Sequence, residues 1–155
     1  MAAPSALQFY ANNLDLLKWG DLTGVTLKLA LLTSAYVSDT TNVGHTVYAN
    51  LTNELATGNG YTAGGVALSA PTIPTFSTTG FSVTTGSASW TASGAGIPAW
   101  RFAVLYVSGT LWALTSPLLG IFTGDSTPAD IPLTASGNTL QVNTPANGWF
   151  TLTRT

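Results

Sequence analysis

The chain has 155 residues, a length that fits one domain, and 45% of them are hydrophobic. Only 6% are charged, against about 25% in typical domains, and the formal net charge is −2. The basic residues, Lys18, Lys28, Arg101 and Arg154, are scattered along the chain. They form no basic patch that could release phosphate counterions, so we expect no nucleic-acid partner.

The chain has no cysteine, which rules out disulfides and thiolate metal sites. Its first residues carry neither a basic segment nor a long apolar run, unlike a signal peptide, so we expect synthesis in the cytoplasm. The longest apolar stretch, residues 27–32, contains Lys28 and is too short to cross a bilayer. We therefore expect no membrane association.

The N-terminal pattern predicts a helix over residues 5–18, with Ser5 as its N-cap and Gly20 as its stop. Its apolar residues fall three and four positions apart, which places them on one face: Leu7, Tyr10, Leu14 and Leu17. This face could pack on its own domain or dock on a neighbouring subunit. We divide the chain into an N-terminal arm and helix, residues 1–20, and a β domain, residues 21–155.

The first strand signal is the alternation over residues 25–33, where leucines face one way and a mixed set faces the other. Residues 34–65 are rich in Asn, Thr, Gly and Asp and predict one long irregular loop, which contains His45. Loops of this length inside a compact domain are commonly functional or mobile.

The second half predicts short strands separated by turn residues. Ser108-Gly109 has the composition of a two-residue hairpin turn. Strands at this spacing are typical of an all-β fold, so we expect a mainly β chain with a single β-sandwich or barrel-like domain. The predicted strands are 66–69, 81–85, 88–91, 100–107, 110–114, 118–122, 140–143 and 149–153.

The residues that could carry chemistry form no catalytic signature. His45 stands alone in its loop, without a nucleophile elbow elsewhere in the sequence. The acidic residues mostly lie beside turns, and residues 124–130 read as a plain turn rather than a cation loop. The glycine-rich segment 58–65 lacks the features of a phosphate loop and indicates tight turns or close backbone packing. We predict no enzyme activity, no cofactor and no metal.

Four of the five tryptophans lie in predicted strands, and Trp19 lies at the end of the predicted helix. Aromatic residues at strand positions serve most often in the core, next as subunit interface anchors, and third as platforms for sugars. The sequence alone leaves these three uses open.

Two groups of ordered phrases stand out in the sequence. The first group is residues 25–36, 51–55 and 60–68, and the second is residues 100–106, 117–121 and 148–152. In this order, over roughly residues 5–152, they resemble a widespread group of small virion proteins of tailed bacteriophages. Residues 107–114 depart from the resemblance, because they are apolar where many relatives have a charged turn.

The resemblance implies a structural role on the virion, most of all as a head decoration (cement) protein on the outside of the shell. Its implied partners are the major capsid protein and other copies of the chain, in trimers or in dimers. The alternative is a tail, baseplate or head-fibre component that binds a receptor or glycan. The resemblance brings no active site with it.

The interface candidates are hypotheses drawn from the apolar N-terminal segment and from the strand and hairpin around Ser108-Gly109. Arg101 sits inside an apolar strand and is expected to pair with a carboxylate or with carbonyl groups at an edge. The candidates are Ala2, Pro4, Leu7, Phe9, Tyr10, Trp100, Arg101, Leu111 and Trp112.

Overall fold

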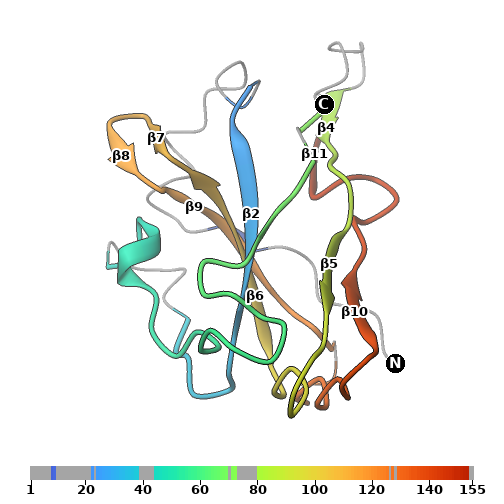
Figure 1. Cartoon of the computed structure of the whole chain (residues 1–155). Coiled ribbons are helices and arrows are strands. Elements are labelled where there is room, and N and C mark those ends of the chain that lie inside the picture. The colour runs from blue at the N-terminus through green and yellow to red at the C-terminus, as the bar shows by residue number, and fades with distance from the viewer. Residues whose placement is uncertain are drawn as a thin grey trace.

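The prediction of a mainly β chain is confirmed by a computed structural model. It describes residues 8–9, 22, 24–38, 44–69, 71–72, 80–125, 127 and 129–153 (Figure 1). Within these residues the paired strands are all antiparallel, and no sheet is closed into a barrel, so the barrel alternative is wrong.

The largest sheet has five strands in the order β1-β9-β6-β2-β3. Its centre is formed by β2, β6 and β9, and β2 pairs with β6 along its whole length, from Thr26↔Ser108 to Leu32↔Phe102. A bulge between Leu105 and Tyr106 shifts the register of β6 against β9. The strands are β1 (Gln8–Phe9), β2 (Thr26–Leu32), β3 (Val66–Ala67), β6 (Phe102–Ser108) and β9 (Leu118–Thr123).

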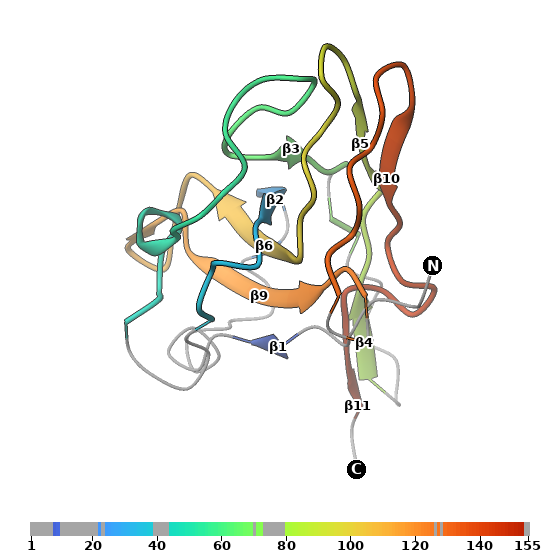
Figure 2. The same cartoon turned by 90° about the horizontal axis from the view of Figure 1, so that it is seen from below.

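A second layer consists of two short ribbons, β4 with β11 and β5 with β10 (Figure 2). The segments between the ribbons are joined by side-chain bonds, including Thr144 Oγ1 to the Gly86 carbonyl at 3.1 Å. Two-stranded ribbons are marginal alone in water, so packing on the larger sheet stabilises them. The strands are β4 (Gly80–Val83), β5 (Ala88–Thr91), β10 (Thr139–Val142) and β11 (Phe150–Thr153).

The predicted hairpin turn at Ser108-Gly109 is wrong. β6 pairs with β9, and a small hairpin of β7 (Thr110–Leu111) and β8 (Leu114–Thr115) extends the end of that pair. The tight turn is Trp112-Ala113, with φ of 54° and 63°. Two consecutive positive φ angles are those of a type I′ turn, which matches the twist of a two-residue hairpin.

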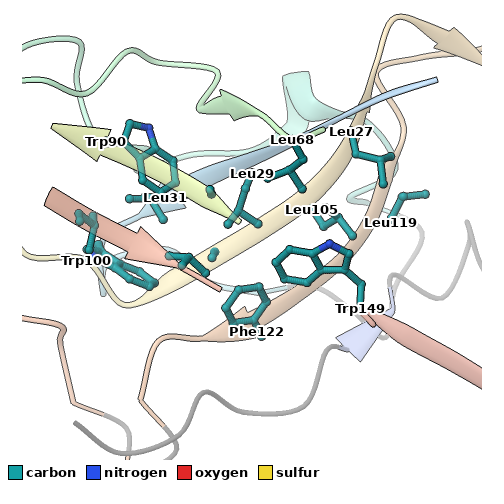
Figure 3. Packing of buried hydrophobic residues seen from close by; sticks show 14 of the residues in the cluster. Leu27, Leu29, Leu31, Leu68, Trp90, Trp100, Leu105, Leu119, Phe122 and Trp149 are labelled. Carbon is teal, nitrogen blue, oxygen red and sulfur yellow. The ribbon is translucent and has the colours of Figure 1, made fainter. Parts of the chain in front are cut away.

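The main core lies between the five-stranded sheet and the second layer (Figure 3). Leu27, Leu29 and Leu31 of β2 contribute one side of it, as the alternating pattern predicts. Trp90 of β5 and Trp149 contribute from the facing layer. Burial of these large apolar side chains supplies the main driving force for folding.

The opposite face of the sheet is also covered. Its buried residues include Ala30 and Leu32 of β2 and Val104 of β6, and Tyr36 packs on them from the loop. The loop predicted at 34–65 is irregular where it is described, except for a 3₁₀ turn, η1 (Tyr48–Asn50). Tyr36, Tyr48 and Leu51 of this loop therefore cover this face of the sheet, whereas Leu55 and Tyr61 belong to the main core.

The predicted helix over residues 5–18 is wrong at Gln8–Phe9. These two residues form β1, which pairs with Gly120 and Ile121 of β9. A strand satisfies backbone donors and acceptors on an edge that would otherwise be unpaired, and this tertiary pairing outweighs the local periodicity. The rest of the predicted helix lies outside the described residues.

Candidate functional site

The most polar cluster of the described residues is built around Glu54, in the loop that crosses the edge of β2. The backbone of Glu54 forms a bridge with Leu32, and the Leu55 N–H donates to the Leu31 carbonyl at 3.0 Å. These bonds align residues 53–55 along the end of β2. The Glu54 carboxylate is thereby positioned beside tyrosines from the loop and from β6.

Three donors meet the Glu54 carboxylate. Tyr61 Oη donates to Oε1 at 2.7 Å, the Gly64 N–H donates to the same oxygen at 2.7 Å, and Tyr48 Oη donates to Oε2. Tyr61 Oη also accepts the Leu31 N–H at 3.0 Å. Hydrogen bonds to an ionised carboxylate are stronger than neutral ones, so this cluster ties the loop to β2.

Tyr106 of β6 extends the cluster across the sheet. Its hydroxyl donates to the Gly64 carbonyl at 2.6 Å, and its ring stacks on that of Tyr48 with centroids 4.8 Å apart. Lys28 stands opposite Tyr106 in the β2–β6 register. The cluster therefore joins two strands of the sheet to both ends of the segment 48–64.

Burial and the neighbouring Glu54 carboxylate keep the tyrosines protonated. Burial, followed by the hydrogen bond to Glu54, raises the pKa of Tyr61 and of Tyr48 well above the ordinary value. Burial, and then the charge of Glu54, raises the pKa of Tyr106 to about 12. A phenol with a raised pKa is a poor base or nucleophile at neutral pH, so these hydroxyls act as donors that hold structure.

We expect stability to fall at alkaline pH because of these shifts. An unfolded tyrosine ionises near pH 10, whereas the folded ones stay protonated, so their stabilising contribution is complete below pH 10 and is lost as the pH rises through the folded pKa values. Tyr61, 1% exposed, should contribute up to about 1 kcal/mol per pH unit. Urea unfolding at pH 8, 10 and 11 measures the slope, which Tyr61→Phe should reduce; an equal slope in this variant contradicts the assignment.

The glycine-rich segment 58–65 serves close backbone packing, as predicted. Gly60 has a φ of 93°, and a Cβ there would lie 2.9 Å from the Thr91 carbonyl carbon of β5. Gly65 has a φ of 67°, and a Cβ there would lie 2.8 Å from Ala30 Cα of β2. The segment therefore touches both layers of the fold, with the buried ring of Tyr61 between its two contacts.

His45 and the remaining acidic residues take structural positions. His45 Nδ1 and the Tyr36 hydroxyl share a hydrogen bond of 2.9 Å, and the two rings stack. Asp125 accepts the Thr127 N–H at 2.9 Å, which is the turn geometry predicted for residues 124–130. In the part of the chain that the structure describes, no three His, Asp or Glu side chains gather to hold a metal ion.

The predicted interface residues that the structure describes lie in different parts of the fold. Phe9 lies in β1, and Trp100 is only 4% exposed in the main core, the first of the uses considered for the tryptophans. Arg101 pairs with a carboxylate as expected, with Nε 2.7 Å from Asp130 Oδ1. Four candidates lie outside the described residues: Ala2, Pro4, Leu7 and Tyr10.

Leu111 and Trp112 lie in the β7–β8 hairpin, where both are half-buried and pack on the rim of the main core. Trp112 and Ala113 adopt positive φ angles, which cost non-glycine residues of order 1 kcal/mol or more each. The type I′ turn between β7 and β8 accounts for these angles. Leu111 and Trp112 are thus interface candidates that the structure places in one hairpin.

Charged residues are absent from one half of the fold. Residues 55–100 and 131–153 contain no Asp, Glu, Lys or Arg. These ranges include all four strands of the second layer and also β3. The four strands of the second layer therefore carry no charged residue, whereas Lys28 lies in β2 of the five-stranded sheet.

Sequence reasoning missed the Glu54 cluster. Tyr36, Tyr48 and Tyr61 were visible in a polar loop, and each is anchored in the structure by its ring or its hydroxyl. Several tyrosines in an otherwise polar loop would have signalled that the loop packs on a sheet. The meeting of Tyr48 and Tyr61 at the carboxylate of Glu54 had no signal in the spacing.

The comparisons with known proteins are negative: no family model, no curated protein and no solved structure matches the chain. Among the residues described, no helix has the length and apolar character needed to cross a membrane.

Proposed function

We propose that this chain is a structural virion protein of a tailed bacteriophage, a decoration protein that binds the outside of the head shell and stabilises it. Its partners are the major capsid protein and other copies of itself. The observation that carries the proposal is the lack of charged residues over residues 55–100 and 131–153, which include all four strands of the second layer. The resemblance of the ordered sequence phrases to small phage virion proteins supports the same role.

An uncharged, hydroxyl-rich surface suits permanent attachment to a lattice. Such a surface has little charge to desolvate on binding, and its contacts depend little on salt. Its strands lack the Lys and Glu residues that usually prevent association, so a free monomer would tend to associate. Many modest contacts on a repeating shell add up through multivalency, and binding to the expanded shell alone stabilises it by mass action.

The hydrogen-bonded carboxylate of Glu54 and the tyrosines around it support a structural role. The carboxylate of Glu54 is occupied by three donors, and burial raises the pKa of the tyrosines around it. Their bonds hold the loop over the sheet and give the domain a fixed surface. The β7–β8 hairpin, with Trp112 at its strained turn, is the proposed contact with the capsid protein.

Imaging intact particles at subnanometre resolution tests the proposal. Density for this fold at repeated sites over the whole head is the expected result. Density confined to the tail or to one vertex would overturn decoration and favour the alternative of a tail, baseplate or head-fibre component.

A binding assay on bare expanded shells tests the hairpin contact. Trp112→Ala should lower occupancy about tenfold or more, as the loss of a buried aromatic anchor does. Thr110→Ala, on the same hairpin but exposed, is the matched control and should bind normally. Equal binding by both variants would exclude the hairpin from the contact.

A further inference from the structure

β10 is an edge strand of the second layer. It pairs with β5 on one side, from Thr139↔Thr91 to Val142↔Ala88, and among the described residues no strand pairs with its other side (Figure 2). An unpaired edge presents a row of backbone donors and acceptors that can pair with another chain.

The backbone groups that point away from β5 can be assigned from the ladder. The Ala92 N–H donates to the Asn138 carbonyl at 2.8 Å, so Asn138 directs its carbonyl towards β5. Because antiparallel residues alternate, Leu140 and Val142 also bond towards β5. Thr139 and Gln141 therefore direct their N–H and carbonyl groups outwards, at the free edge.

This edge lacks the usual protection against pairing. Natural edge strands carry Lys, Pro or a bulge, whereas β10 reads Thr-Leu-Gln-Val and pairs with β5 in an unbroken register. The side chains of Thr139 and Gln141 are exposed, and those of Leu140 and Val142 are buried towards the main core. The edge is thus flat, regular and uncharged.

We infer that two copies of this chain pair through β10, edge to edge and antiparallel, to form a continuous sheet β5-β10-β10-β5. The two-fold axis passes between the Leu140 residues of the two copies, so Thr139 of each copy pairs with Gln141 of the other. A second copy is the fitting occupant because an antiparallel edge is self-complementary under a two-fold axis. The surface has no charge to repel its own copy or to select a partner of opposite charge.

The pairing register makes a charge-swap test possible. The double variant T139K/Q141K places lysine opposite lysine twice across the axis, and should weaken association about tenfold or more. The double variant T139K/Q141E places lysine opposite glutamate twice, and should remain a dimer. Sedimentation velocity of the purified full chain over a range of concentrations measures the association of both, and near-UV circular dichroism checks that each is folded.

A control variant separates the edge from the face of the sheet. S89K/T91K puts two lysines on exposed positions of β5, one strand inside the edge, and should leave the dimer intact. The expected wild-type result is a species of twice the chain mass. A monomeric wild type, a dimeric T139K/Q141K variant, or a monomeric T139K/Q141E variant would each overturn the inference, and none of these outcomes depends on the proposed virion role.

Discussion

Gly65→Ala should abolish folding or lower the free energy of unfolding by more than about 4 kcal/mol. The new Cβ would overlap the Leu29 carbonyl oxygen and lie 2.8 Å from Ala30 Cα, both in the backbone of β2. β2 is held between β3 and β6, so it cannot move away from the methyl group. The φ of 67° adds the cost of a left-handed alanine.

Gly137→Ala is the matched control for this substitution. Gly137 also has a positive φ, 84°, but a Cβ there would meet nothing within 4 Å. It should cost about 1 kcal/mol, the conformational part alone. Urea unfolding of both variants measures the difference, and similar losses in the two would show that close packing at Gly65 contributes little.

Glu54→Ala should lower the free energy of unfolding by about 3–5 kcal/mol. It leaves the Gly64 N–H without its carboxylate partner, and it also removes the acceptor of the buried Tyr61 hydroxyl. The loop would keep its backbone bonds to β2 but would lose the carboxylate that joins Tyr48, Tyr61 and Gly64. Hydrogen exchange should show the effect first at Leu31, whose N–H donates to Tyr61.

Two conservative variants separate the contributions of Glu54 and Tyr61 to the free energy of unfolding. Glu54→Gln keeps the shape and one oxygen acceptor but loses the charge, and should cost about 1–2 kcal/mol. Tyr61→Phe keeps the buried ring and removes the hydroxyl that both donates to Glu54 and accepts from Leu31. In the double variant the two losses should not add, because the residues share one bond. Fully additive losses would contradict the cluster as a unit.

The placement of β5 and of most longer strands could be predicted from the sequence because their signals are local. β1 lies in the predicted helix, and the predicted strand over residues 110–114 contains the Trp112-Ala113 turn. Ala88–Thr91 is a strand over the predicted residues, and β2 shows the predicted alternation of leucines towards the core. Turn residues mark where these strands end, whatever they pair with. The close packing of the segment 58–65 was likewise visible in its glycines.

The partners of the strands, and the cluster between them, were decided only by the tertiary structure. Ser108-Gly109 has the composition of a hairpin turn, yet the turn falls at Trp112-Ala113 because β6 pairs with β9 beyond it. Gln8–Phe9 lies within a helical pattern, yet it forms a strand because the edge of β9 offers backbone partners.

The same distinction applies to the uncharged strands and to the Glu54 cluster. The lack of charge in residues 55–100 and 131–153 can be read from the sequence, as can the single Glu between 40 and 124. Contacts between distant residues decide that the uncharged strands β4, β5, β10 and β11 share one layer, and that this Glu meets three donors. Local patterns carry no information on such contacts, because long-range pairing is set by which faces bury most apolar surface together.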